Sequence, residues 1–258
     1  MNDERCRIQS PHGYGLACVI RQAPEAVGTV LLLHGFGSGK DSKYNRALVP
    51  LLQQHLLNSV RFDFCGHYES GGSTADLTIA TAADDLISVL RDTQETLQVE
   101  RLGIVASSFG ASAAIRCIRE ITPLNAVCFR APVSDYAATR RRQLGPTGIL
   151  EWERAGLIEI DSSDGPVISP YEFYEDALSH DAYSEARAIG APTLIIQGTN
   201  DDTVLVEESQ ALARAIGDHA RLAIIPGADH GFKNAAHFQE LVDLTVGFMT
   251  ESMGTHST

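Results

Sequence analysis

The chain has 258 residues, and its hydrophobic content of 44% is enough for a globular core, which excludes a disordered protein. Its 20 basic and 33 acidic residues give a formal net charge of −13, which repels phosphate backbones and anionic membranes, so no nucleic acid partner is expected. The longest unbroken apolar run, Leu16–Ile20, is far shorter than the ~20 residues of a membrane-spanning helix, so no membrane partner is expected either.

The first predicted element is an antiparallel hairpin, in which Arg5–Gln9 and Leu16–Arg21 flank the turn Pro11-His12-Gly13. Six apolar runs follow that lack the in-and-out alternation of a half-exposed strand, which predicts parallel strands buried on both faces. These runs are Val30–Leu33, Val60–Phe64, Leu102–Ala106, Ala126–Phe129, Thr193–Ile196 and Leu222–Ile225.

Segments with helical spacing alternate with these strands. Their apolar stripes comprise Ala82, Leu86, Val89, Leu90 and Thr93; then Leu212, Ala215 and Ile216; and finally Phe238, Leu241, Val242, Thr245 and Phe248. A hairpin followed by repeated strand–helix units predicts a doubly wound α/β fold, with a mostly parallel eight-stranded sheet and an antiparallel edge hairpin.

The stretch 133–188 breaks this rhythm, because it has no buried-strand run and is punctuated by Gly, Pro and Asp. Within it, Gly156–Asp161 and Pro166–Ser169 are expected to form a small hairpin across Ser162–Gly165. No linker, repeat or low-complexity tract divides the chain. We therefore interpret residues 1–258 as one domain with a small inserted lid at about 133–188.

The strand Leu102–Ala106 is followed at once by Ser107 and Ser108, and then by an alanine-rich segment expected to be helical through about Glu120. A strand that ends in small-x-Ser-x-Gly and opens a helix is the context of a nucleophile elbow. The alternative is a serine that caps an ordinary helix.

The tight turn of an elbow requires small residues two positions before and after the nucleophile. Ala106 and Gly110 meet this requirement for Ser108, whereas Val105 and Phe109 would collide with the turn around Ser107. Ser108 is therefore the predicted nucleophile.

A serine nucleophile needs a general base, and the base needs an orienting carboxylate. Two later strands are each followed by a loop with suitable side chains: Asp201 and Asp202 after the first, and Asp229 and His230 after the second. The chain order Ser, Asp, His is the order that accompanies a nucleophile elbow. His230 is the predicted base. Either Asp201 or Asp202 could be the carboxylate that orients His230. Asp229 is a weaker candidate because it adjoins His230 in the sequence, and consecutive side chains point in different directions.

Three other histidines compete with His230 as candidate bases. His34 and His67 lie near strand ends at the expected site, but they precede the nucleophile, and His34 is expected to orient its own loop. His180 is expected at the surface.

The segment His34-Gly35-Phe36-Gly37 follows a predicted strand, where a backbone N–H is expected to complement the one after the nucleophile. The predicted oxyanion donors are the amides of Phe36 and Phe109, and the Phe36 ring is expected to form an apolar wall. Nucleotide binding is disfavoured, because neither G-x-x-x-x-G-K-[ST] nor G-x-G-x-x-G occurs there.

Together these motifs resemble the α/β-hydrolase superfamily from about Arg5 to Met249, and especially small carboxylesterases of the cinnamoyl or feruloyl esterase type, with dienelactone-hydrolase and serine-aminopeptidase-like relatives. The matching segments are Leu33–Phe36, Arg61–His67, Glu69-Ser70, the Ser108 elbow, Gly198–Val204 and Gly227–His230. The resemblance implies Asp201 as the acid, three residues after the glycine, and a mainly structural Asp63. Two departures are Ala106 for the usual glycine of the elbow, and Tyr68 for a frequent glycine at the pocket mouth.

The resemblance implies a serine hydrolase in which Ser108 attacks an ester carbonyl, His230 accepts the proton, and Asp201 steadies the imidazolium. No metal or organic cofactor is expected. The expected partner is a small-molecule ester with a small or aromatic acyl group, and a homodimer is left open. A peptidase, amidase or acyl-thioesterase would use the same three residues, and a catalytically silent binding protein is a weaker alternative.

The lid carries six of the chain's seventeen aromatic residues, among them Tyr136 and Trp152, which are candidate substrate contacts. Alternatively these rings form the lid's own core. The cluster Arg140–Arg142 is more typical of a solvated helix face than of a carboxylate-binding site.

Five cysteines lie at positions 6, 18, 65, 117 and 128, an odd number without C-x-x-C spacing. This pattern predicts reduced, mostly buried thiols in a cytoplasmic protein, rather than a disulfide framework or a zinc site.

Overall fold

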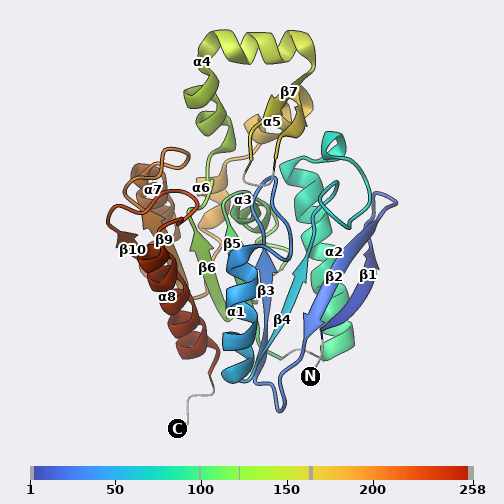
Figure 1. The fold of residues 1–258 in the computed structure, drawn as a ribbon, viewed down its shortest axis with the longest axis vertical. Helices are drawn as coiled ribbons and strands as arrows, with labels where there is room; N and C mark the ends of the chain where they lie inside the picture. The colour runs from blue at the N-terminus through green and yellow to red at the C-terminus, as the bar shows by residue number, and fades with distance from the viewer. Residues whose placement is uncertain (1–2, 99, 122, 163–164, 255–258) are drawn as a thin grey trace.

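The computed structural model describes residues 3–98, 100–121, 123–162 and 165–254. They form an eight-stranded sheet in the order β1-β2-β4-β3-β5-β6-β9-β10 (Figure 1). Strand β2 pairs antiparallel with β1 and β4, and all the other neighbouring strands are parallel. The predicted doubly wound α/β fold, with its antiparallel hairpin at one edge, is confirmed.

The strands of this sheet are β1 (Glu4–Gln9), β2 (Gly15–Arg21), β3 (Gly28–Leu33), β4 (Leu57–Phe62), β5 (Leu102–Ser107), β6 (Ala126–Arg130), β9 (Thr193–Gly198) and β10 (Ala220–Ile225). The helices that connect them are α1 (Lys43–Gln54), α2 (Ile79–Leu97), α3 (Phe109–Arg116) and α7 (Val206–Ile216), with short 3₁₀ turns at Thr74–Asp76 and Gly217–His219, and α8 (Ala235–Met253) follows the last strand.

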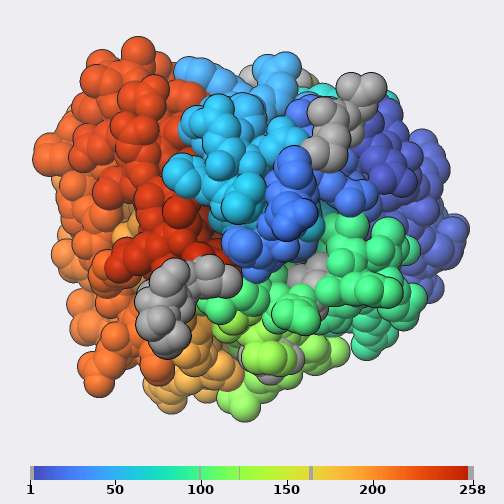
Figure 2. Space-filling model, turned by 90° about the horizontal axis from the view of Figure 1, so that it is seen from below, coloured from blue at the N-terminus to red at the C-terminus, as the bar shows by residue number. Residues whose placement is uncertain are grey.

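Helices cover both faces of the sheet, which explains why β3, β4, β5 and β9 are buried at every residue. Helices α1 and α8 pack on one face, where the Tyr44 hydroxyl lies 2.6 Å from Thr245 Oγ1. Helices α2, α3 and α7 pack on the other face. The end of the molecule seen in Figure 2 shows α8 (red) beside the chain around α1 (blue) and the region that follows α2 (green).

Two predicted details are wrong. The sequence predicts β10 as buried on both faces, but it is the last strand of the sheet and most of its residues are partly exposed. Helix α3 is predicted to reach Glu120, but it ends at Arg116. Beyond it the chain forms tighter turns, in which the Ile118 amide donates to the Ile115 carbonyl at 3.2 Å.

The insert (residues 133–188) separates β6 from β9 and lies beyond the carboxyl ends of the strands (Figure 1). It comprises α4 (Tyr136–Ala155), β7 (Leu157–Ile160), β8 (Val167–Pro170), α5 (Tyr171–Leu178) and α6 (Ala182–Ala186). Strands β7 and β8 form the predicted hairpin, whose turn residues 163–164 lie outside the described part of the chain. Helix α4 is kinked at Gly145, which has φ 66° and precedes Pro146.

The insert has a small aromatic core of its own. Trp152 is fully buried, its ring packs against Tyr171 and Tyr174 at centroid distances of 5.7 and 5.6 Å, and its Nε1–H donates to the Ser169 carbonyl at 3.1 Å. The aromatic richness of this segment is therefore explained in part by packing within the insert.

All five cysteines are free thiols, as predicted, and four of them are buried. Within the described ranges, no helix has both the length and the apolar surface needed to cross a bilayer.

Two glycines let the loops at the carboxyl edge approach one another closely. A Cβ atom at Gly110 would lie 2.7 Å from the His34 carbonyl oxygen, and one at Gly198 would lie 2.2 Å from the Ala228 carbonyl oxygen. Since real Cβ contacts of this length are not tolerated, only glycine permits these two approaches. The loops after β3, β5, β9 and β10 thereby come together at one edge of the sheet.

Replacing Gly198 tests this constraint. Gly198→Ala is expected to lower the free energy of unfolding by about 1–3 kcal/mol, because the new methyl group displaces the backbone at Ala228. Gly190→Ala is the matched control, because a methyl group added there would have no heavy atom within 4 Å. Urea unfolding followed by circular dichroism measures both, and equal stability of the two variants would contradict the argument.

Candidate active site

Ser108 lies in a strained turn between β5 and α3. Its φ of 49° and ψ of −114° are rare for a residue that carries a Cβ. The turn is held by the Ser108 amide, which donates to the Arg130 carbonyl at 2.9 Å, and by the close packing of Gly110 on the preceding loop. This geometry presents the Ser108 hydroxyl above the carboxyl edge of the sheet.

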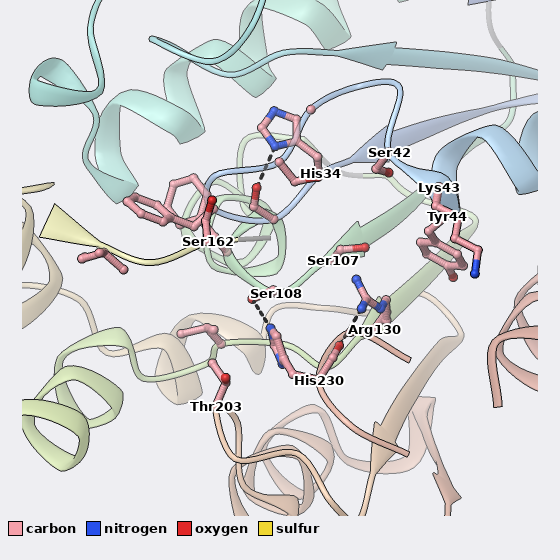
Figure 3. A pocket seen from close by; sticks show the side chains of 18 of the residues that line it. His34, Ser42, Lys43, Tyr44, Ser107, Ser108, Arg130, Ser162, Thr203 and His230 are labelled. Atoms are coloured by element: carbon pink, nitrogen blue, oxygen red, sulfur yellow. Dashed lines mark hydrogen bonds between the residues drawn. The ribbon is translucent and has the colours of Figure 1, made fainter. Parts of the chain in front are cut away.

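A continuous chain of hydrogen bonds connects Ser108, His230 and Asp201. Ser108 Oγ lies 3.1 Å from His230 Nε2, and His230 Nδ1 lies 2.8 Å from Asp201 Oδ2. An ionised carboxylate only accepts hydrogen bonds, so the proton is assigned to Nδ1 and Nε2 is left to accept from the hydroxyl. An imidazole in this arrangement is able to take the hydroxyl proton (Figure 3).

The Asp201 carboxylate is held by the loop that follows β9. Its Oδ1 accepts from the amides of Thr203 and Val204 at 2.9 and 2.8 Å, and its Oδ2 accepts from Gln197 Nε2 at 3.0 Å. Burial alone would raise the pKa of Asp201, but the hydrogen bonds from His230, Val204 and Gln197 hold this pKa below its ordinary value. The carboxylate is thus fixed in its charged form and in position.

The other two candidate acids do not meet the imidazole. Asp202 is exposed, and its hydrogen bond is with Thr203 Oγ1 at 3.4 Å. Asp229 accepts from the Lys233 amide at 2.8 Å. Only Asp201 of the three faces His230.

The loops that carry the predicted oxyanion donors adjoin the serine. Phe36 and Phe109 both line the cavity above Ser108, and their rings pack against each other at 6.0 Å. Across the described part of the chain, neither amide donates a backbone hydrogen bond, which leaves both N–H groups free. A Cβ atom at Gly35 would lie 3.3 Å from Ser108 Cβ, so the loop of Phe36 passes close beside the nucleophile.

Two buried histidines support the loop that carries Phe36. His34 Nδ1 lies 2.8 Å from the Gly35 carbonyl, and its Nε2 accepts from the Phe64 amide at 3.0 Å. His67 Nε2 accepts from the Gly37 amide at 3.1 Å. Burial lowers the pKa of both imidazoles, which keeps them neutral. His34 therefore positions its own loop, and His67 supports the same loop from the other side.

Asp63 holds a neighbouring loop. It accepts from the Lys40 amide and from Lys40 Nζ, both at 2.7 Å, and Lys40 also pairs with Glu69. Tyr68 lines the cavity with 63% of its surface exposed.

Arg130 is a site residue that the sequence motifs did not reveal. It ends β6, and its Nη2 donates to the His230 carbonyl at 2.6 Å (Figure 3). The guanidinium lies over the rings of Phe232 and Tyr44, and burial lowers its pKa. Its one signal in the sequence is a basic residue directly after a buried run, which is too general a pattern to indicate a role.

A cavity of about 1090 Å³ opens above these residues. The insert contributes Tyr136 to its wall, where the ring packs against Phe173 at 4.4 Å. Trp152, the other predicted substrate contact, does not line the cavity because it is enclosed in the core of the insert.

The three arginines of the cluster in the insert have different surroundings. Arg140 lines the cavity, Arg141 donates to the Tyr174 hydroxyl at 3.2 Å, and Arg142 pairs with Glu208 at 2.8 Å. His180, expected at the surface, instead pairs with Asp176 at 3.2 Å, and only 9% of its side chain is exposed.

The hairpin of the insert contacts the loop that carries Phe36. Ser162 Oγ donates to the Gly37 carbonyl at 3.2 Å, next to the amide of Gly37 that donates to His67. The insert and the predicted oxyanion loop therefore share a direct contact.

Comparison with known proteins shows which proteins share this architecture. The model of the alpha/beta hydrolase family matches residues 30–244. Among curated proteins, the chain is 25% identical over 204 residues to the mitochondrial palmitoyl-protein thioesterase ABHD10 of Pongo abelii. That match covers 76% of this chain and 64% of the relative, so the chain spans less than two thirds of that protein's length.

Two solved structures show the same fold. Est1E from Butyrivibrio proteoclasticus, bound to ferulic acid, aligns with a TM-score of 0.82 at 22% identity, covering 97% of this chain and 100% of that one. Alpha/beta hydrolase domain-containing protein 10 from mouse aligns with a TM-score of 0.82 at 18% identity, covering 96% and 99%.

The contrast between the two adjacent aspartates gives a direct test of the site. Asp201→Asn is expected to slow fluorophosphonate labelling of Ser108 by about 10³–10⁴-fold, because an amide that donates to Nδ1 favours the wrong imidazole tautomer. Asp202→Asn removes the same charge but does not touch His230, and it is expected to label at nearly the rate of the unmodified protein. Mass spectrometry of the labelled chain measures both rates, and a similar loss in the two variants would refute the assignment of Asp201.

Proposed function

The chain belongs to the alpha/beta hydrolase family, and from this premise we propose that it is a serine hydrolase that cleaves carboxylic esters through an acyl-enzyme. The observation that carries the proposal is the hydrogen-bonded chain from Ser108 Oγ to His230 Nε2 at 3.1 Å, and from His230 Nδ1 to Asp201 at 2.8 Å. This chain opens on a cavity of a size suited to a small-molecule substrate.

In the first step, Ser108 Oγ forms a bond to the ester carbonyl carbon while its proton passes to His230 Nε2. The negative charge that develops on the carbonyl oxygen is stabilised by the amides of Phe36 and Phe109. The carbon–oxygen bond to the alcohol then breaks, and the alcohol leaves with the proton from His230. The acyl group remains on Ser108.

In the second step, water gives a proton to His230 and attacks the acyl carbon. The second tetrahedral intermediate uses the same two amides, and its collapse returns the proton to Ser108 and releases the acid. Asp201 keeps the imidazole oriented and stabilises its charged form in both steps.

The walls of the cavity favour a small or aromatic acyl group. The rings of Phe36, Phe109 and Tyr136 line the cavity, and each packs against Phe173 of the insert. In this proposal the insert covers the site and sets the shape of the acyl group that fits, with Tyr136 as its substrate contact. The structure of Est1E with ferulic acid supports an aromatic acyl group by similarity of fold.

An acyl-thioesterase is the second candidate, because ABHD10 carries the name of a palmitoyl-protein thioesterase. The same steps cleave a thioester, with a thiol leaving in place of the alcohol. A peptidase or amidase would also use these residues, but no particular contact of this chain favours an amine leaving group. A panel of hydroxycinnamate esters, acyl thioesters and aminoacyl anilides separates the three classes by their kcat/KM values.

Replacing each of the two adjacent serines tests the nucleophile. Ser108→Ala is expected to lower turnover of 4-nitrophenyl acetate by at least about 10³-fold without unfolding the protein, because the acylated oxygen is removed. Ser107→Ala, at the end of β5, is the matched control and is expected to retain turnover within tenfold. Comparable turnover in the Ser108→Ala protein, with circular dichroism confirming its fold, would exclude the mechanism.

A further inference from the structure

The basic residues of this acidic protein are concentrated around the cavity. The chain contains only three lysines, Lys40, Lys43 and Lys233, and all three line the cavity above Ser108. Four arginines line it as well: Arg5, Arg46, Arg130 and Arg140. A net charge of −13 predicts the opposite sign for an average part of the surface.

Most of these cations form no ion pair. Lys40 pairs with Asp63 and Glu69, and Arg5 pairs with Glu69. The remaining five form no ion pair with any carboxylate in the described ranges, namely Lys43, Arg46, Arg130, Arg140 and Lys233. Three carboxylates that line the cavity likewise form no ion pair within the described residues, and these are Asp161, Asp202 and Asp229.

Three of the unpaired cations come from the start of α1 and from the loop before α8, and we call Lys43, Arg46 and Lys233 the basic rim. Lys43 and Arg46 are in the first turn of α1, and Lys233 lies in the loop between His230 and α8. Lys43 Nζ is 4.0 Å from the centre of the Phe238 ring near the start of α8, so the first turn of α1 contacts the helix that follows Lys233. Figure 3 shows Lys43, Tyr44 and Arg130 on one side of Ser108, and Ser162 of the insert on the other.

Two residues of the rim lie where a helix does not favour cations. The amino end of a helix carries a partial positive charge, which disfavours cations and favours acidic residues. Helix α1 instead begins with Lys43 and Arg46 near that end and has no acidic residue in its first turn. Repulsion of this kind is relieved when an anion binds beside the rim.

We infer that the substrate carries an anionic group, a carboxylate or a phosphate, which binds at the basic rim while its ester or thioester carbonyl lies at Ser108. This inference rests on the proposed function and deepens it. Two of the unpaired carboxylates, Asp161 and Asp202, belong to the insert and to the loop after β9. The third, Asp229, shares a loop with Lys233, whose backbone amide donates to it at 2.8 Å. A positive rim at the edge of a cavity attracts and orients an anionic substrate.

The anion has two sources, depending on which part of the substrate carries it. It belongs to the acyl group in a half-ester of a dicarboxylic acid, and to the leaving group in a thioester of a phosphorylated thiol. Two matched pairs of substrates distinguish them. The first pair is mono-4-nitrophenyl adipate against 4-nitrophenyl hexanoate, and the second is hexanoyl-coenzyme A against the hexanoyl thioester of N-acetylcysteamine.

At low ionic strength, the anionic member of at least one pair is expected to have a kcat/KM at least tenfold above that of its neutral partner. The pair that shows this preference identifies the side that carries the anion. The preference is expected to shrink as salt is raised beyond about 0.1 M, where the screening length falls to about 10 Å. Equal or lower kcat/KM for the anionic member of both pairs would overturn the inference, while hydrolysis of the neutral members would leave the proposed function standing.

Charge variants test whether the preference for the anionic substrate depends on the basic rim. The double variant Lys43→Gln with Lys233→Gln is expected to lower the ratio of anionic to neutral kcat/KM by at least fivefold. Arg91→Gln is the matched control, because Arg91 is exposed on α2 and does not line the cavity. An unchanged ratio in the double variant, or an equal fall in the Arg91 variant, would overturn the assignment to the rim.

Binding measurements without turnover test the basic rim independently of ester cleavage. Isothermal titration of the Ser108→Ala protein with monomethyl adipate, methyl hexanoate and coenzyme A measures affinity when no bond is cleaved. Monomethyl adipate or coenzyme A is expected to bind at least tenfold more tightly than methyl hexanoate. Equal or weaker binding of both anions would overturn the inference even if the protein hydrolysed none of the four substrates.

Discussion

Close backbone contact at the carboxyl edge of the sheet is the constraint on which the site depends. The serine, the imidazole and the carboxylate come from loops after β5, β10 and β9, and they meet only because those loops nearly touch. Gly198 against the Ala228 carbonyl sets the loop of Asp201 beside the loop of His230, and Gly110 against the His34 carbonyl sets the turn of Ser108 beside the loop that carries Phe36. The hydrogen bonds of Ser108, His230 and Asp201 are a consequence of that packing, as much as of the side chains themselves.

The same edge is supported by polar groups that are buried and neutral. His34 and His67 lose their charge on burial, and each uses its unprotonated nitrogen to accept a backbone amide. Charged imidazoles could not accept these hydrogen bonds. Arg130 plays a complementary part, because it anchors the backbone of His230 from β6. The site thus has a rigid support on both sides of Ser108.

Local patterns in the sequence predict the fold and the three side chains that meet at the sheet edge, because strand runs, the elbow and the two loops carry short-range signals. Ser108 was distinguished from Ser107 by the size of its neighbours, which is a property of the turn itself. The role of Arg130, the burial of Trp152 and the exposure of β10 could not be predicted in this way. Each depends on which elements pack together in space, and the spacing of residues along the chain does not contain that information.

The contact between Ser162 and the Gly37 carbonyl connects the insert to the loop that carries Phe36. In the proposed function, the segment that selects the acyl group therefore touches the loop that stabilises the oxyanion. A chimera that receives the insert of another family member would lose this partner of the Gly37 carbonyl, one residue from the proposed oxyanion donor Phe36. Exchange of the insert would therefore change the support of that loop as well as the cover of the cavity.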